Sequence, residues 1–490
     1  MKVTGKGNSA GKIRVIEKGT KIHMNGTDSK IIINTDITYQ TMESFGASGG
    51  WWAQYVGGWD KACALNKRTV REELAMLLYD REYGIGLTNY RYNVGAGSAD
   101  SGKGNIEDVH RRAESFETAP GVYDWNKDAN AVWFLRKAAE LGAKEVVFFC
   151  CSPPERLTMN GLAHMEEGSR GNLLPENYTE FARYVLDAAE HFIQEGIPVR
   201  YISPINEPQW FWCGRQEGCR YEPGEATGVY RAFVKEWKER PGLKEARISG
   251  PESGEWKGET IPYTAAILED PELREHFEVI DNHSYWTKAE DKKDFKAWME
   301  EFHPEVRLRM SEWCEMVNGS DYTMDSAFNL AEVLTEDLTI LEVVSWQIWV
   351  AVGPVGHRNA VIYIDEEKQT YEPLKRLWGY GNYTRFIRPG FTRVKVLHEN
   401  GRTEELKPVA FRGVNERGEE QLAAVFLNRS AAHRSFSLCD EGRTEYSKIN
   451  IYETSEQFNL ACILERDYNK NMVIDLNPMS ITTVIFTGAS

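Results

Sequence analysis

The sequence lacks the features that would assign it to several large classes of protein. No stretch reaches 18 consecutive apolar residues, which excludes a transmembrane helix. Basic residues do not outnumber acidic ones, since 58 Lys and Arg stand against 74 Asp and Glu, a formal charge of −16. Nucleic acids and anionic membrane surfaces both favour a basic face. We therefore expect neither as a partner, and nothing in the sequence indicates an oligomeric state.

The first residues also lack the apolar core of a secretory signal peptide. They read MKVTGKGNSAGKIRVIEKG, which is polar overall. As the sequence stands we expect a cytoplasmic protein. If a leader was removed, the expectation changes to a secreted one.

Cysteine patterns typical of metal sites are missing as well. Eight cysteines are scattered over 490 residues, with no CxxC pair, and no HExxH motif occurs. This distribution argues against a disulfide framework and against a zinc site. We expect neither metal nor cofactor. Cys213 and Cys219 are close enough in sequence to bridge a loop, and that alternative stays open.

From about residue 42 the sequence alternates short apolar runs with longer stretches of helical periodicity. The expected strands are 42–47, 86–93, 145–151, 199–205, 245–250, 277–285, 306–312 and 343–349. The expected helices are 64–80, 128–141, 177–195, 226–239, 259–269, 290–302, 323–337 and 371–387. Eight strands separated by helices predict an α/β fold, a closed eight-stranded (β/α) TIM barrel rather than an open sheet.

The two ends of the chain have a different pattern, with strand-like alternation and turn signals. Pro389-Gly390 marks a boundary, and residues 389–490 predict an antiparallel β-sandwich side domain. Residues 12–38 predict two short antiparallel strands joined near Asn25-Gly26. We expect residues 1–40 to join the sandwich and residues 41–388 to form the barrel.

A carboxylate follows two strands of the predicted barrel. Strand four ends in Asn206-Glu207-Pro208 and strand seven in Ser311-Glu312-Trp313. The carboxyl ends of barrel strands meet in one cleft. Two facing carboxylates are what cleavage of a glycosidic bond requires. Either Glu alone could cap a helix or pair with an arginine, so their joint placement carries the hypothesis.

Other strand ends offer hydrogen-bonding groups and flat aromatic faces for a sugar. We expect Trp346 to face the barrel mouth and Trp349 to lie in the core, while His283 could also be structural. The candidate substrate-binding residues are Trp51, Trp52, Arg91, Ser152, Asn206, His283, Tyr285 and Trp346. Charged residues after strand four are typical of a solvated loop: Arg215, Glu217, Arg220 and Glu222.

These motifs together resemble glycoside hydrolase family 30. The resemblance covers most of the chain and rests on 43–49 (ESFGASG), Arg91, 152–154 (SPP), 206–208 (NEP), Tyr285 and 310–312 (MSE). It implies that Glu207 is the acid/base and Glu312 the nucleophile of a retaining β-glycosidase. It also implies that Asn206 binds the sugar 2-hydroxyl, while Arg91 and Tyr285 support the nucleophile.

The resemblance further implies a raised pKa for Glu207, an ionised Glu312 and carboxyl groups about 5–5.5 Å apart. The 46–54 stretch (GASGGWWAQ) looks most like the endo-β-1,6-galactanase branch, so β-1,6-galactan is the expected substrate. Hydrolysis of a β-xylan, a β-xyloside or a β-1,6-glucan is the alternative. Relatives commonly have an aromatic residue after SPP, whereas this chain has Glu155, which changes the wall of the cleft.

Two other classes of function compete with this hypothesis. The 46–50 stretch (GASGG) fits the G-x-S-x-G pattern of serine hydrolases, with Ser48 as nucleophile, but it does not open a helix as that motif requires. A non-catalytic carbohydrate-binding protein could share the barrel and the aromatic residues. It would not need both Glu207 and Glu312.

Overall fold

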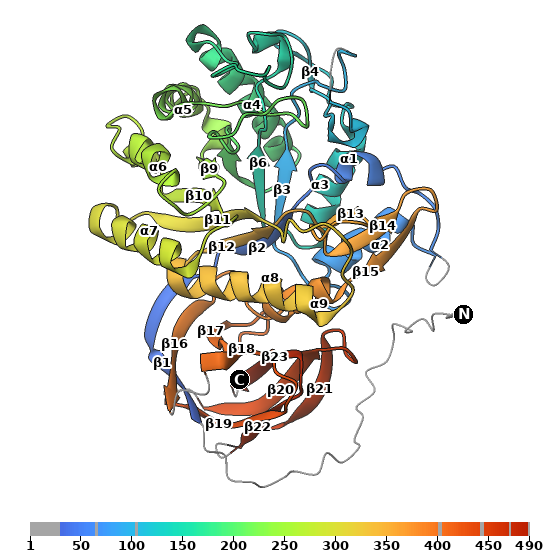
Figure 1. The fold of residues 1–490 in the computed structure, drawn as a ribbon, viewed down its shortest axis with the longest axis vertical. Coiled ribbons are helices and arrows are strands. Elements are labelled where there is room, and N and C mark those ends of the chain that lie inside the picture. Colours follow the sequence, from blue (N-terminus) through green and yellow to red (C-terminus); the bar gives the residue numbers. More distant parts are fainter. Residues whose placement is uncertain are drawn as a thin grey trace.

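The computed structural model describes residues 30–63, 67–102, 106–399, 404–441, 445–469 and 472–488. Figure 1 shows a barrel above a smaller β-sheet domain, with helices α8 and α9 lying between the two. The turn predicted near Asn25-Gly26 and the strand before it lie outside the described residues, whereas the second predicted strand overlaps β1 (Lys30–Thr41).

A curled sheet of parallel strands forms the centre of the barrel, as the sequence predicts. Its hydrogen-bonded order is β8-β7-β6-β3-β2-β12-β11-β10-β9. The predicted fifth strand, 245–250, contains only the first of two short strands, which pairs with β7; the second follows Ser249 and Gly250 and pairs with β10. The ring therefore closes through this one segment. The strands are β2 (Ser44–Ser48), β3 (Asn89–Asn93), β6 (Glu145–Phe149), β7 (Val199–Ser203), β8 (Arg247–Ile248), β9 (Pro251–Ser253), β10 (Val279–His283), β11 (Arg307–Trp313) and β12 (Ser345–Ile348).

Helices surround the barrel strands (Figure 1). α2 begins at Val70 rather than near 64, because Thr69 and Glu72 form a reciprocal capping box there. The helices are α1 (Ala53–Val56), α2 (Val70–Tyr79), α3 (Ala129–Leu141), α4 (Tyr178–Gln194), α5 (Pro223–Lys238), α6 (Thr260–Leu268), α7 (Ala289–Phe302), α8 (Met324–Glu336) and α9 (Lys375–Thr384). Within the described residues, no helix is long and apolar enough to cross a membrane.

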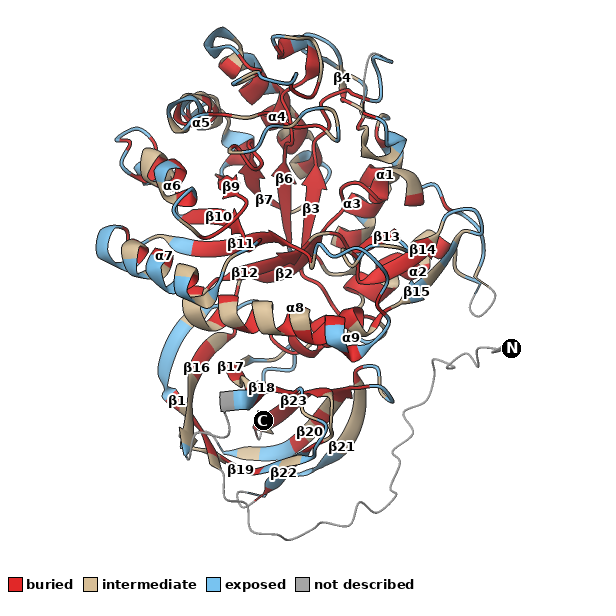
Figure 2. Cartoon of the chain, in the orientation of Figure 1, coloured by how far each residue is buried: buried red, intermediate tan, exposed pale blue. Residues whose placement is uncertain are grey.

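The barrel strands are buried along nearly their whole length (Figure 2). The end of the barrel away from Glu312 contains a layer of charged side chains. Arg309 on β11 donates to Asp281 at 2.9 Å, to Glu145 at 2.6 Å and to Glu43 at 2.7 Å. Each carboxylate offsets part of the cost of burying the guanidinium, so the layer is stable only as a complete set.

The side domain is a single curled nine-stranded sheet, in the order β21-β20-β23-β18-β17-β16-β1-β19-β22. The expectation of a wholly antiparallel sandwich is wrong in one respect, because β1 pairs parallel with β19. These two strands are far apart in sequence, so no hairpin forces them to be antiparallel. The strands are β1 (Lys30–Thr41), β16 (Thr392–Glu399), β17 (Val409–Val414), β18 (Glu420–Asn428), β19 (Arg434–Asp440), β20 (Tyr446–Thr454), β21 (Ala461–Asp467), β22 (Val473–Leu476) and β23 (Ser480–Gly488).

Both faces of this sheet are buried at its centre. Along β18, Leu422, Ala424 and Phe426 point into a core that the sheet encloses, whereas Val425 and Leu427 belong to the core of the barrel. This is the period-2 alternation of a strand between two apolar layers. The barrel and side domain therefore share a continuous core.

Two small sheets complete the described structure. They consist of β4 (Glu117–Ala119) with β5 (Val122–Tyr123), and of β13 (Val352–Pro354), β14 (Ile362–Asp365) and β15 (Thr370–Pro373). All eight cysteines are free thiols. The alternative of a Cys213–Cys219 bridge is therefore wrong; the Cys213 side chain is exposed and that of Cys219 is buried.

Candidate active site

The two carboxylates predicted from strands four and seven lie together at the carboxyl end of the barrel. Glu207 follows β7, and Glu312 lies within β11. One oxygen of each and one ring nitrogen of His283 all lie within 4.8 Å of one another. Both glutamates are buried, with 7% and 6% of their surface exposed. Glu207 has a φ of +44°, which costs on the order of 1 kcal/mol and is typical of functional sites.

Two donors hold Glu312. Arg91 on β3 donates to its Oε2 at 2.6 Å, and the Tyr285 hydroxyl donates to its Oε1 at 3.0 Å. Arg91 is itself fully buried and lies 3.6 Å from the centre of the Phe149 ring. This packing fixes the guanidinium, so the position of the Glu312 carboxylate is fixed as well.

Arg91 also connects Glu312 to the strand-four motif. Its second terminal nitrogen donates to Asn206 Oδ1 at 2.9 Å and to Glu252 Oε2 at 3.2 Å. Asn206 is thereby held beside the carboxylate pair. Glu252, on β9, was missed by the sequence analysis, although it follows the fifth predicted strand as Glu207 follows the fourth.

His283 on β10 lies between Glu207 and Glu252. Its Nδ1 is 3.1 Å from Glu207 Oε1 and its Nε2 is 3.0 Å from Glu252 Oε2. Burial alone would lower the pKa of His283. The charge of Glu312 and the hydrogen bonds to Glu207 and Glu252 outweigh this effect and raise that pKa to about 10. The ring is therefore a cation at neutral pH.

The two glutamates on either side of His283 shift in opposite directions. Burial raises the pKa of Glu207, and the bond from His283 only partly offsets this. Burial also opposes ionisation of Glu252, but Arg91 and the bonds from His283 and Ser311 lower its pKa to about 2. The site thus contains a permanent anion at Glu252 and, at Glu207, a carboxyl group whose pKa is raised.

Glu207, His283 and Glu312 are also the set of described residues whose ligand atoms cluster closely enough for a metal ion. A metal binds a neutral imidazole through a nitrogen lone pair. Both nitrogens of His283 lie within hydrogen-bond distance of carboxylate oxygens, which leaves neither ring nitrogen directed at a metal. We therefore assign no metal to this set.

An aromatic wall stands beside Arg91. Trp51 and Trp349 pack edge to face at 5.7 Å, and Phe149 lies 6.4 Å from Trp349. The expectation that Trp346 faces the mouth is wrong, whereas Trp349 is partly buried and packs against the core as expected. Trp346 is fully buried and donates to Asp337 Oδ2 at 2.9 Å, away from the carboxylates. The sequence located this strand but did not show that Trp346 points away from the barrel mouth.

Two further candidates lie away from the carboxylates. Trp52 donates to the Ser48 carbonyl at 2.8 Å and packs on Phe134 of α3, so it belongs to the core. Ser152 is buried, and its hydroxyl donates to the Pro153 carbonyl at 3.0 Å. Neither reaches Glu207 or Glu312 through a described contact.

The structure also bears on the charged loop and on the serine motif. Glu217 is fully buried and accepts from Ser98 Oγ at 2.6 Å, so the expectation that it is solvated is wrong. Burial raises the pKa of Glu217 to about 7. Ser48 is buried at the end of β2, and its hydroxyl has no hydrogen-bond partner among the described residues. It therefore lacks the base that a serine nucleophile needs.

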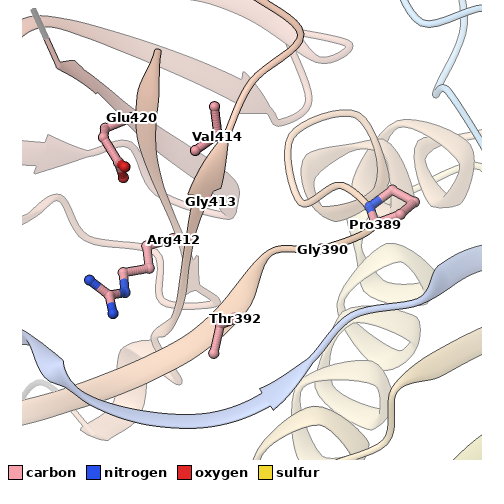
Figure 3. A pocket seen from close by; sticks show the side chains of 7 residues that line it. All are labelled: Pro389, Gly390, Thr392, Arg412, Gly413, Val414 and Glu420. Atoms are coloured by element: carbon pink, nitrogen blue, oxygen red, sulfur yellow. The ribbon is translucent and has the colours of Figure 1, made fainter. Parts of the chain in front are cut away.

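A separate hollow of about 480 Å³ lies on the side domain (Figure 3). Its walls come from β16, β17, β18 and the turn at Pro389, and Arg412 and Glu420 are its charged lining residues. None of the carboxylates described above lines it. We therefore assign it no part in the site.

Comparison with known proteins agrees with this geometry. The sequence profile of O-glycosyl hydrolase family 30 matches residues 28–257, a segment that includes Asn206 and Glu207. Nearly half of the chain is thus similar to glycoside hydrolase family 30. Over 221 residues it is 28% identical to an endo-β-1,6-galactanase of Hypocrea rufa, which covers 40% of this chain and 43% of the galactanase.

Solved structures extend the similarity in fold to nearly the whole chain. A conserved exported protein from Bacteroides fragilis superposes with a TM-score of 0.80 at 24% identity, covering 93% of this chain and all of that one. The catalytic domain of the family 30 xylanase C from Talaromyces cellulolyticus gives 0.72 at 18% identity, covering 93% and 99%. β11, with Glu312, lies within the fold that they share but outside the matched profile segment.

Proposed function

We propose that this protein hydrolyses β-glycosidic bonds with retention of configuration, with Glu312 as nucleophile and Glu207 as acid/base. The short separation of the two carboxylates carries the proposal. Their nearest oxygens lie within 4.8 Å, which fits the separation of about 5–5.5 Å of retaining enzymes rather than the wider gap of inverting ones.

The partners of each carboxylate fit its proposed role. In the first step, a Glu312 oxygen attacks the anomeric carbon while Glu207 gives its proton to the departing glycosidic oxygen. Arg91 and Tyr285 keep the attacking carboxylate oriented. In the second step, Glu207, now a carboxylate, takes a proton from water. The resulting hydroxide attacks the anomeric carbon and displaces Glu312.

We propose β-1,6-galactan as the substrate. The similarity to the Hypocrea rufa galactanase supports this choice, and so does the GASGGWWAQ stretch, which contributes Trp51 to the aromatic wall beside Arg91. Xylan and β-1,6-glucan are the alternative substrates within the same mechanism, and the test below separates them.

The test is a panel of β-1,6-galactan, β-1,6-glucan and xylan oligosaccharides. It compares the wild type with Glu207→Gln and Glu312→Gln, and Glu315→Gln serves as a matched control on the same barrel edge. We expect turnover of the galactan series, a loss of at least about 10³-fold in both active-site variants and little loss in the control. Turnover of another series alone would refute the substrate. Activity surviving in both active-site variants would refute the mechanism.

Azide separates the roles of the two carboxylates. With Glu207→Ala, azide should attack the glycosyl–enzyme and give a β-glycosyl azide. With Glu312→Ala, azide should attack the substrate directly and give an α-glycosyl azide. The opposite pairing of products would mean that the two roles are exchanged.

A further inference from the structure

Two tryptophans are exposed beside the carboxylate pair, although large aromatic side chains usually lie inside a protein. Trp210 follows Glu207 in the loop after β7, and Trp286 follows Tyr285 in the loop after β10. They are 37% and 55% exposed. Their rings pack against each other with centroids 5.7 Å apart and an angle of 76° between the planes. We call this pair the Trp210–Trp286 platform.

The platform adjoins the proposed acid/base. A Cβ on Gly254 would lie 3.0 Å from Glu207 Oε1, 3.1 Å from Trp210 Nε1 and 2.8 Å from Gln209 Nε2. These three polar atoms therefore surround one small space above the backbone of Gly254. The side-chain amide of Gln209 is buried and has no hydrogen-bond partner within the described residues.

Backbone contacts hold the platform in place. Trp210 N–H donates to the Glu207 carbonyl at 3.2 Å. On the other side, the Tyr285 N–H donates to the Gly254 carbonyl at 3.2 Å, and the Trp256 N–H donates to Thr287 Oγ1 at 3.1 Å. Trp286 lies between the residues that make these two hydrogen bonds. Its φ is +50°, a conformation that costs free energy for a bulky residue. Its exposed ring is thus held by the loop rather than free to fold inward.

We propose that the Trp210–Trp286 platform, together with Gln209, binds the sugar ring on the leaving-group side of the bond that is cleaved. This inference rests on the proposed function. Glu207 must contact the departing oxygen, so the groups around Glu207 contact the ring to which that oxygen is attached. The Trp51–Trp349 wall lies beside Arg91 and Phe149 instead. We therefore assign it to the sugar on the other side of the cleaved bond.

The chemistry of the platform fits a carbohydrate better than an alkyl chain. A pyranose has an apolar C–H face that packs on indole and hydroxyls around its edge that need polar partners. The side-chain amide of Gln209 and the indole N–H of Trp210 lie next to the flat faces of the two tryptophan rings, where they can bind such hydroxyls. An alkyl leaving group would leave these polar groups unpaired.

The test compares three leaving groups on one glycosyl unit. β-1,6-Galactobiose fills the platform with a sugar, octyl β-galactoside fills it with an alkyl chain, and β-galactosyl fluoride leaves it empty. For Trp210→Ala and for Trp286→Ala, we expect kcat/KM on the disaccharide to fall about tenfold more than on the fluoride. Trp210→Phe should restore part of that difference. Phe302→Ala removes an exposed aromatic ring at the end of α7 and should give no such difference.

An equal loss on all three substrates, or no loss on the disaccharide, would overturn the proposal. A larger loss on the octyl galactoside than on the disaccharide would overturn the assignment to a sugar. If the wild type cleaves only the glucose or xylose series, the proposed substrate fails and the same comparison is made with that sugar. A wild type inactive on every series contradicts the hydrolase itself, and the platform proposal falls with it.

Discussion

At the scale of single residues, His283 determines the charge of the site. Its two nitrogens contact Glu207 and Glu252, so one imidazolium serves two carboxyl groups that ionise differently. Glu252 is the permanent anion that keeps His283 and Arg91 paired. Glu207 can therefore gain and lose a proton while the charges around it stay fixed, as an acid/base must.

This arrangement predicts the pH dependence of His283→Gln. The bond and the charge of His283 lower the pKa of Glu207, which burial raises. The variant keeps a donor but removes the charge, so Glu207 should stay protonated to a higher pH. The alkaline limb of kcat/KM, where an acid loses its proton, should move to higher pH than in the wild type. His303→Gln, which alters a histidine outside the site, should leave the limb in place, and a shift to lower pH would contradict the account.

Gly254 provides a second prediction at this scale. A methyl group there would lie 2.8–3.1 Å from side-chain atoms of Gln209, Glu207 and Trp210, closer than ordinary contacts. These atoms can move, so Gly254→Ala should cost little stability but should displace the Glu207 carboxyl. We expect kcat to fall at least about tenfold with Tm changed by only a few degrees. An alanine at Gly258 would meet open space, so Gly258→Ala should keep both the wild-type kcat and the wild-type Tm. Full activity in Gly254→Ala would refute the role of Gly254 in positioning the Glu207 carboxyl.

At the scale of elements, the barrel strands could be read from the sequence while their faces could not. Apolar runs bounded by turns identified all eight strand positions, and the position of a strand's end placed Glu207 and Glu312. The wrong face for Trp346 has a simple cause. Parallel barrel strands are buried on both sides, so no polar–apolar alternation marks the inner face. Glu252 was missed because Ser249 and Gly250 interrupt its strand.

Arg309 on β11 tests the charged layer between these strands. Its guanidinium joins β11 to Asp281 of β10 and Glu145 of β6. Arg309→Met would leave buried carboxylates without their cation, and we expect the free energy of unfolding to fall by about 3–5 kcal/mol in urea titrations. Arg200→Met, at an exposed position of β7 outside the layer, should cost about 1 kcal/mol or less. Equal losses in the two variants would contradict the role of the layer.

At the scale of the whole molecule, the barrel and the side domain share one core. Strand β18 contributes Val425 and Leu427 to the barrel side, and α9 binds β23 through Asn382, which donates to Thr483 Oγ1 at 2.8 Å. The composition and turn signals predicted two regions. They could not show this shared core, because it depends on which faces of β18 and β23 pack on the barrel.

A shared core predicts a single unfolding transition. Loss of activity, tryptophan fluorescence and far-UV circular dichroism should all change at the same temperature, because neither part can unfold without exposing the apolar face of the other. A calorimetric trace with two separated transitions would contradict this. A chain ending at residue 388 should not fold by itself, because the α9 face that packs on β23 would be exposed.

The central claim is that the paired carboxylates act by double displacement, and the configuration of the first product tests it most directly. Wild-type enzyme is mixed with β-1,6-galacto-oligosaccharide, and the anomeric protons are followed by NMR before mutarotation. The account predicts that the β-anomer forms first and that Glu312→Gln forms no product. Initial release of the α-anomer would show inversion and would contradict the mechanism, whatever the identity of the sugar.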